Sequence, residues 1–153
     1  MPNKPYILIT GVNSDLGFAT AKVLAEKHYL ILSGRNLDEL KEIQLKLKNK
    51  QDHLIWNIDL FENELSLKLI KFLDETKAEI KAFIHFAGFF KVSPLRLLKE
   101  QEIINSFKIN VLSAIQISIV LSKKKYRKNL KDIIFISSIS ALRGKTGFSL
   151  YAS

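Results

Sequence analysis

Short apolar runs and longer amphipathic segments alternate along this chain. The apolar runs are bulky or β-branched, which is typical of buried strands. Between them lie segments whose apolar residues recur every three or four positions, as in amphipathic helices. The alternation predicts strands at 6–9, 29–33, 54–58, 82–86 and 132–138, and helices at 15–27, 36–48, 62–76 and 100–123.

The order of these elements predicts the fold class. Strands that alternate with helices of about 10 to 15 residues are joined by right-handed crossovers and form a parallel sheet. We therefore predict an α/β, doubly wound parallel sheet (Rossmann fold) with helices on both faces. No repeat, low-complexity segment or linker divides the sequence, so residues 1–153 are predicted to form one domain.

A glycine turn joins the first strand to the first helix. Gly11 and Gly17 flank it and Thr10 precedes it. A strand–turn–helix of this kind presents free backbone N–H groups and the positive end of a helix dipole, which can hold a pyrophosphate. The residues predicted to bind a nucleotide here are Gly11, Asn13, Ser14, Asp15, Leu16 and Gly17. Asp15 is expected to cap the helix, and a turn that binds no ligand is the alternative.

The next two strands also end in candidate binding residues, and ligands of such sheets bind at the carboxyl ends of the strands. Arg35 and Asn36 follow the second strand, about 20 residues past the turn, where an arginine fits a 2′-phosphate. This favours NADP(H) over NAD(H); an exposed arginine at a helix start is the alternative. Asp59 and Leu60 follow the third strand, where the alternative for Asp59 is a helix cap.

The fourth strand ends in His85-Phe86-Ala87-Gly88. Ala87 and Gly88 are predicted to contact the cofactor through their backbone, whereas a single histidine is more often a satisfied core residue than a ligand. The three histidines have no metal-ligand spacing, and the chain has no cysteine, so we predict no metal site.

Two serines end the fifth strand, and Tyr151 follows Ser138 by 13 residues. Together with the earlier motifs, this spacing resembles the short-chain dehydrogenase/reductase family over essentially the whole chain. The turn resembles the family's Thr-Gly-x-x-x-Gly-x-Gly, with Asp15 in place of the middle glycine. Asp59 is similar to the family's adenine-contacting aspartate, and Ala87-Gly88 match the second half of its Asn-Asn-Ala-Gly motif.

The resemblance implies an oxidoreductase that transfers a hydride between a nicotinamide and a small carbonyl or alcohol substrate. Such a transfer needs a hydrogen bond to the developing alkoxide and a proton donor at the same oxygen. By resemblance Ser138 gives the first and Tyr151 the second, while Asn110 holds a water in the proton path. The family also places a lysine four residues after the tyrosine, which would be position 155, past the last residue, 153. We therefore expect the amino-terminal part of a longer reductase, with a sheet incomplete at the carboxyl end; a truncated, non-catalytic nucleotide-binding module is the alternative.

The predicted helix at 100–123 has apolar residues on two faces, so it needs two partners. One partner would be the sheet. The family resemblance implies that the other is the same helix of another subunit, in a homodimer or homotetramer. The first face comprises Ile103, Ile104, Phe107, Val111, Ala114 and Ile115, and the second begins with Leu112, Ile119 and Val120.

The net charge of +9 alone would suggest a nucleic-acid partner. However, the densest basic run, at 123–131, falls between a helix and a strand, which favours a solvated loop. No recognition-helix or stacking motif supports nucleic-acid binding. We see no secretory leader and no apolar run of 18 residues that predicts a membrane span, so we expect a cytoplasmic protein without a membrane partner.

Overall fold

The computed structural model describes residues 4–152; residues 1–3 and 153, at the ends of the predicted domain, lie outside the described part. The predicted fold class is confirmed: five parallel strands form one sheet in the order β3-β2-β1-β4-β5. The strands are β1 (Tyr6–Thr10), β2 (Tyr29–Gly34), β3 (Leu54–Asn57), β4 (Ile80–His85) and β5 (Asp132–Phe135). The α-helices are α1 (Asp15–Leu24), α2 (Leu37–Leu45), α3 (Leu65–Thr76), α4 (Glu100–Phe107), α5 (Ser113–Leu121) and α6 (Ser149–Ala152). Shorter helical turns are η1 (Lys50–Asp52), η2 (Leu95–Leu97), the π-helical η3 (Lys108–Leu112) and η4 (Ile139–Ala141).

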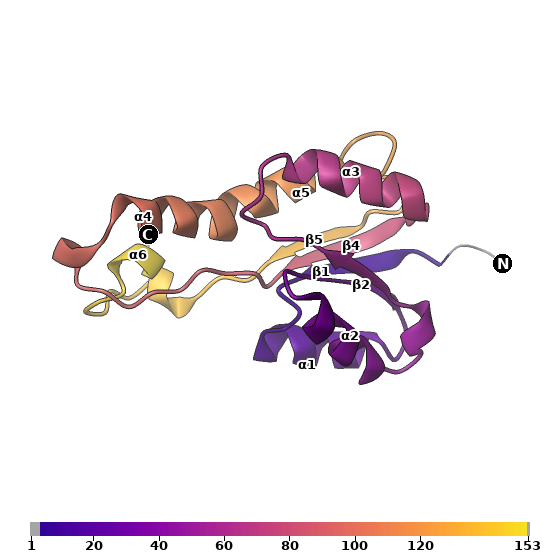
Figure 1. Cartoon of the computed structure of the whole chain (residues 1–153), viewed down its shortest axis with the longest axis horizontal. Helices are drawn as coiled ribbons and strands as arrows, with labels where there is room; N and C mark the ends of the chain where they lie inside the picture. Colours follow the sequence, from indigo (N-terminus) through magenta and orange to yellow (C-terminus); the bar gives the residue numbers. More distant parts are fainter. Residues whose placement is uncertain (1–3, 153) are drawn as a thin grey trace.

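Helices cover both faces of the sheet. Figure 1 shows α1 and α2 on one face and α3 and α5 on the other. The strand order reverses beside β1, because β2 follows β1 on one side and β4 pairs with it on the other. Thr10 at the end of β1 is in register with Ser33 of β2 and His85 of β4. These carboxyl ends therefore meet at the position where doubly wound sheets bind their ligands.

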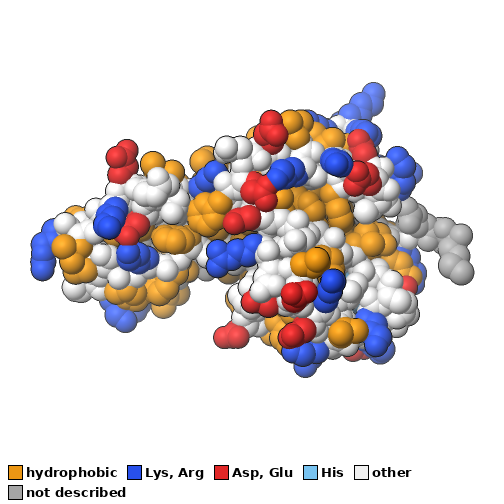
Figure 2. Space-filling model, in the orientation of Figure 1, with side chains coloured by type: hydrophobic (Ala, Val, Ile, Leu, Met, Phe, Trp, Pro, Cys, Tyr) orange, Lys and Arg blue, Asp and Glu red, His pale blue; other side chains and the backbone are white. Residues whose placement is uncertain are grey.

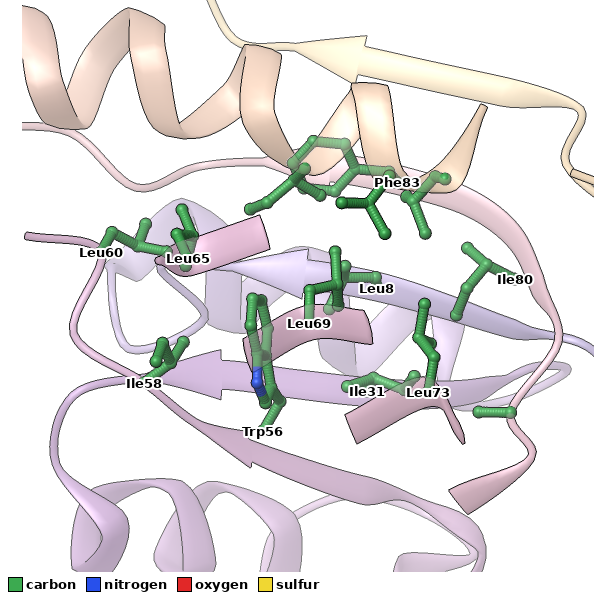
Figure 3. Close-up of a cluster of buried hydrophobic side chains, with 14 of the residues drawn as sticks. Leu8, Ile31, Trp56, Ile58, Leu60, Leu65, Leu69, Leu73, Ile80 and Phe83 are labelled. Atoms are coloured by element: carbon green, nitrogen blue, oxygen red, sulfur yellow. The ribbon is translucent and has the colours of Figure 1, made fainter. Parts of the chain in front are cut away.

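The larger core cluster lies between the sheet and α3 and α5. Leu8, Ile31 and Trp56 of the sheet pack here with Leu69 of α3, and each of the four is at most 4% exposed (Figure 3). The Trp56 ring centroid lies 6.1 Å from that of Phe72. Burying one such side chain contributes about 1.5–3 kcal/mol, so this cluster fixes the strands relative to the helices.

The stretch predicted as one helix at 100–123 is divided into α4, η3 and α5. Most members of the first apolar face are 40–48% exposed, and Ala114 alone among them is buried, so within this chain that face lacks the sheet as its partner. In the second face Val120 is buried, whereas Leu112 and Ile119 are exposed. The buried positions are instead Ser106, Ile109, Ser113, Ala114, Ile117, Val120 and Leu121.

The fifth strand is shorter and more exposed than predicted. It ends at Phe135, and all four of its residues are exposed, so the prediction of a buried strand was wrong. The reason is that β5 is an edge strand that pairs only with β4 in the described part of the chain. After β5 the chain continues into η4 and α6, which lie near α4 in a region that projects past the sheet (Figure 1). Figure 2 shows many hydrophobic side chains on the surface of this region.

The segment Glu100–Leu121 is long and apolar enough to cross a membrane, judged by length and composition alone. Polar residues such as Asn105, Lys108 and Asn110 interrupt the segment, so it holds no unbroken apolar run of 18 residues. Core helices of soluble proteins pass it too, and here the buried positions of the segment pack against the sheet and α3.

The basic run at 123–131 is tied to the end of α3. Lys125 Nζ lies 2.6 Å from Oδ1 of Asp74, and the Tyr126 hydroxyl donates to the same oxygen at 2.9 Å. These two partners lower the pKa of Asp74. The Asn129 side chain also donates to Glu79 at 2.6 Å, so part of the run is engaged within the chain.

Candidate functional site

A first pocket of about 320 Å³ opens at the carboxyl ends of β1 and β2. Its walls come from the glycine turn, the ends of β2 and β3, and the segment after β4. The lining residues are Gly11, Asn13, Ser14, Ser33, Gly34, Arg35, Ile58, Asp59, Leu60, Phe61, Phe86, Ala87, Gly88, Phe89 and Ile109. The structure thus brings together eight predicted cofactor residues from four separate parts of the sequence: Gly11, Asn13, Ser14, Arg35, Asp59, Leu60, Ala87 and Gly88.

The two glycines of the turn stand where a side chain has no room. Gly11 has a φ of +67°, and a Cβ built on it would lie 2.5 Å from the backbone N of Ala87. A Cβ on Gly17 would lie 2.5 Å from the carbonyl oxygen of Gly11. The turn therefore packs backbone against backbone, and its Gly11 and Ser14 N–H groups donate to the carbonyls of Ser33 and Gly11.

Helix α1 begins at this turn, and its cap differs from the prediction. Ser14 is the N-cap: its Oγ accepts from the Gly17 N–H at 3.1 Å and donates to the Gly11 carbonyl at 2.9 Å. Asp15 is the first helical residue, so its assignment as the cap was wrong. Because Ser14 occupies the N–H of Gly17, the N–H groups of Asp15 and Leu16 are those that this helix start offers to a ligand.

Four predicted cofactor residues do not line the first pocket: Asp15, Leu16, Gly17 and Asn36. The Leu16 side chain is exposed, and Asn36 caps α2 by accepting from the N–H groups of Asp38 and Glu39. The Nδ2 groups of Asn36 and Asn13 both donate to Glu39, each at 3.1 Å. Glu39, which belongs to α2, thus connects this helix to the glycine turn, and the exposed Arg35 lies next to this connection.

Asp59 closes the far wall of the first pocket. Its Oδ1 accepts from the N–H of Phe61 at 3.0 Å and so stabilises the turn after β3. The alternative that Asp59 caps the next helix was wrong, because α3 begins at Leu65, after Glu64.

A second pocket of about 240 Å³ adjoins the first, and Phe86, Ala87 and Gly88 line both. All three predicted catalytic residues line this second pocket: Asn110, Ser138 and Tyr151. They come from η3, the end of the segment after β5, and α6. The topology therefore places the predicted catalytic residues next to the predicted nucleotide site.

Ser138 keeps a hydroxyl proton for a ligand, because its Oγ accepts from the Ser140 N–H at 3.2 Å as the cap of η4. The Tyr151 ring meets Phe90 edge-on, with 4.8 Å between centroids. The N–H of Ser93 donates to the Gly147 carbonyl at 2.9 Å. These contacts hold the segment after β4 against the end of the chain that carries the tyrosine.

The Asn110 side chain clamps the loop after β4. Its Oδ1 accepts from the Phe89 N–H at 2.6 Å, and its Nδ2 donates to the Phe89 carbonyl at 3.1 Å and to Ser106 Oγ at 3.2 Å. Every polar atom of this side chain therefore has a partner. Its Oδ1 accepts one hydrogen bond and has a second lone pair, which could still accept from a water.

Two buried polar side chains lie at the site, of which the sequence pattern singled out His85 but not Ser33. Ser33 is 1% exposed, and its Oγ is the one buried side-chain polar atom of residues 4–152 without a hydrogen-bond partner. His85 is 4% exposed and lines the second pocket, with Thr10 Oγ1 2.8 Å from its Nδ1. The expectation of a satisfied core histidine is confirmed. The sequence held a signal for Ser33, because it follows the second apolar run as Thr10 follows the first.

The sequence matches the family described as short chain dehydrogenase over residues 5–153. The chain belongs to this short-chain dehydrogenase family. Membership agrees with the parallel sheet and with the motifs along the chain, and it implies use of an NAD(P) cofactor.

Related proteins include an uncharacterised oxidoreductase of Listeria monocytogenes, which is 32% identical over 150 residues, or 96% of this chain. A short-chain dehydrogenase of Penicillium roqueforti is 27% identical over 139 residues. The chain spans 60% of the length of the Listeria protein and 55% of the Penicillium protein.

Solved structures share the fold. A short chain dehydrogenase from Salmonella enterica superposes with a TM-score of 0.84 at 19% identity and covers 98% of this chain and 64% of its own. A short chain dehydrogenase from Shigella flexneri gives a TM-score of 0.85 at 21% identity and covers 98% of this chain and 61% of its own. At this level of sequence identity, each comparison shows that this chain shares the fold of the solved structure.

Proposed function

We propose that the chain is the nucleotide-binding domain, residues 1–153, of an NADP(H)-dependent oxidoreductase that acts on a small carbonyl or alcohol substrate. The observation that carries the proposal is the junction of the two pockets. Ala87 and Gly88 line both, so a nucleotide in the first pocket would extend toward Asn110, Ser138 and Tyr151 in the second.

The residues of the first pocket fit a dinucleotide phosphate. The tight backbone contact at Gly11 and the N–H groups at the start of α1 suit the pyrophosphate. Arg35 is exposed at the wall beside Gly34, and its guanidinium suits a 2′-phosphate because it can donate two parallel hydrogen bonds. Asp59 and Leu60 would contact the adenine. When bound, the cofactor supplies or accepts the hydride.

The residues of the second pocket suit the proton side of the reaction. Ser138 would donate its free O–H to the substrate oxygen, and Tyr151 would exchange a proton with the same oxygen. Asn110 would hold a water in the proton path, while its side chain fixes Phe89.

We also propose a cytoplasmic homo-oligomer, a dimer or tetramer, whose partner is a small molecule and not nucleic acid or a membrane. The exposed apolar face of α4, η3 and α5 supports self-association, because Ile104, Val111 and Ile115 are 41–48% exposed there.

Binding tests the proposal without requiring turnover. We expect calorimetric titration to give a Kd for NADPH about tenfold or more below that for NADH, since charged hydrogen bonds to a phosphate contribute about 1.5–3 kcal/mol. Arg35→Asp should abolish this preference. The control Arg96→Asp, in η2, should retain it.

Two results would contradict different parts of the proposal. If neither nucleotide binds, the assignment of the first pocket is wrong. If both bind and Arg35→Asp leaves the preference unchanged, the pocket assignment stands and the choice of NADP(H) is wrong.

A further inference from the structure

The wall of the second pocket carries no acidic side chain, no lysine and no arginine. Among the described residues fifteen line this pocket, and none of them belongs to these types, although 25% of the chain does. The first pocket differs, because both Arg35 and Asp59 line it. Lys108 and Arg143 follow lining residues closely in the sequence, but they do not line the second pocket themselves. A charged group on a substrate would therefore find no side chain of opposite charge in this wall.

His85 lines the second pocket but is engaged within the chain. Its Nδ1 lies 2.8 Å from Oγ1 of Thr10, and its Nε2 donates to the carbonyl oxygen of Ile109 at 3.1 Å. Burial lowers the pKa of this imidazole, while the hydrogen bond to Ile109 acts in the opposite direction. At neutral pH the ring therefore offers a substrate neither a free N–H nor a positive charge.

The amide of Asn110 has no free donor either. Its Nδ2 donates to the Phe89 carbonyl at 3.1 Å and to Ser106 Oγ at 3.2 Å, which uses both N–H groups. The side-chain donors that remain in the pocket are hydroxyl groups, among them those of Ser138 and Tyr151. Hydroxyl groups suit a carbonyl oxygen, whereas a carboxylate removed from water needs a cation or several strong donors.

Apolar side chains make up most of the remaining wall. Phe135 and Ile136, at the end of β5, are 53% and 45% exposed, so an apolar ligand has surface there to cover. The Phe135 ring meets Phe83 edge-on, with 6.3 Å between centroids, which fixes its orientation. The larger apolar lining residues are Phe86, Phe107, Val111, Phe135, Ile136 and Leu150.

We propose that the substrate of the second pocket is an uncharged ketone with an aromatic or aliphatic group beside the carbonyl, and not a keto acid or a phosphorylated compound. This inference rests on the proposed function of the pocket. In the reduction the carbonyl carbon accepts a hydride from NADPH, and the carbonyl oxygen accepts a proton from Tyr151, which regains one from solvent. The products are NADP⁺ and a neutral secondary alcohol, so neither the substrate nor its product requires a charged partner in the wall.

The first experiment compares two probes that differ by one carboxylate. Acetophenone and 4-acetylbenzoate are titrated into the ¹⁵N-labelled chain at pH 7.5 and 150 mM NaCl, and binding is followed at the amides of Phe135, Ile136 and Leu150. We expect acetophenone to bind about tenfold tighter or more, because the wall leaves the carboxylate unpaired. The net charge of +9 favours the anion, so the expected preference runs against the overall field of the chain. Equal affinities, a preference for the carboxylate, or no shift of these amides with either probe would overturn the proposal.

Two neighbouring variants test whether the pocket wall decides this preference. Ala141 lines the second pocket, whereas the next residue, Leu142, does not line it and is 87% exposed. Ala141→Lys should raise the affinity for 4-acetylbenzoate about tenfold, because it supplies a cation at the wall. Leu142→Lys adds the same charge outside the pocket and should leave this affinity within about twofold. Equal gains in both variants would show that overall charge sets the preference and would overturn the assignment to the wall.

Repeating the titrations with NADPH present separates this inference from the proposed function. If NADPH does not bind while acetophenone is still preferred, the proposed function fails and the apolar, uncharged ligand class of the second pocket stands. If NADPH binds and the two ketones bind equally well, the nucleotide site stands and the substrate class is wrong.

Discussion

The two pockets share a wall, but they are built in different ways. The first lies at the ends of β1, β2 and β3, and its shape comes from backbone contacts such as the approach of Gly11 to Ala87. The second lies between loops that are held by single side chains, above all Asn110 on Phe89. Leu8 and Leu32 beneath the first pocket are 0% exposed, whereas Phe135 and Ile136 at the second are 53% and 45% exposed.

This difference indicates which of the two pockets keeps its shape when the chain begins to unfold. Regions with few buried apolar contacts open locally at a lower free-energy cost than the buried core. We therefore expect the first pocket to persist until the whole domain unfolds, and the second to open on its own. The following four predictions test this contrast.

The largest effect should come from the core beneath the first pocket. Leu8→Ala should lower the free energy of unfolding by about 3–4 kcal/mol, because it leaves a cavity among fully buried side chains. Ile134→Ala in β5, where the side chain is 44% exposed, should cost less than about 1 kcal/mol. Urea denaturation of both variants measures the contrast, and equal losses would remove it.

The next effect concerns the backbone contact at the glycine turn. Gly11→Ala should cost about 3 kcal/mol, since it combines a positive φ with a contact of 2.5 Å, and it should also abolish nucleotide binding. Gly144→Ala is the control, because a Cβ there meets nothing within 4 Å. Thermal unfolding and NADPH titration test both variants. A Gly11→Ala chain that binds like the wild type would contradict the role of the turn.

A smaller and local effect is expected at the second pocket. Asn110→Ala should cost about 2 kcal/mol, because it leaves the N–H and the carbonyl of Phe89 without their partner. Hydrogen exchange of the Phe89 amide should accelerate more than exchange in β1. Asn105→Ala, which removes only the contact with Gln101, should leave Phe89 unchanged. Uniform acceleration across both regions would mean that the second pocket does not open separately.

The smallest effect is a dependence of stability on pH. Burial lowers the pKa of both His53 and His85 below the ordinary value, so the unfolded chain binds protons first as the pH falls. Stability is therefore complete above about pH 6.5 and declines below it, by at most about 1.4 kcal/mol per pH unit for each histidine. Urea midpoints at pH 7.5 and 5.5 measure this decline. Replacing either histidine with asparagine should reduce the slope, and an unchanged slope would exclude that residue as its source.

The sequence was most informative where local pattern and backbone geometry coincide. The strand at 6–9, the glycine turn and the helix after it were all predictable, because β-branched runs, positive φ and helical periodicity act over a few residues. The cap was assigned one residue too late, at Asp15 and not Ser14, because both residue types satisfy N–H groups at a helix start.

The sequence was least informative where polar side chains face inward. In the helical stretch from Glu100 to Leu121, the pattern gave two apolar faces but not the one that meets the sheet, and the structure buries Ser106 and Ser113 while Ile103 and Ile115 are exposed. These serines bond to Asn110 and to the Ile109 carbonyl, partners that only the folded chain reveals. The apolar pattern predicted residues 136–138 as part of the fifth strand, but the pairing of β5 with β4 ends at Phe135.

Trp56, the single tryptophan of the chain, lies in the core cluster below the first pocket. Its emission therefore reports on one half of the molecule. An experiment that follows fluorescence alone will record the loss of the β1–β3 region and will be blind to an earlier opening around Tyr151. If the circular dichroism signal falls at a lower temperature than the tryptophan emission changes, the region around Tyr151 opens before the β1–β3 region unfolds.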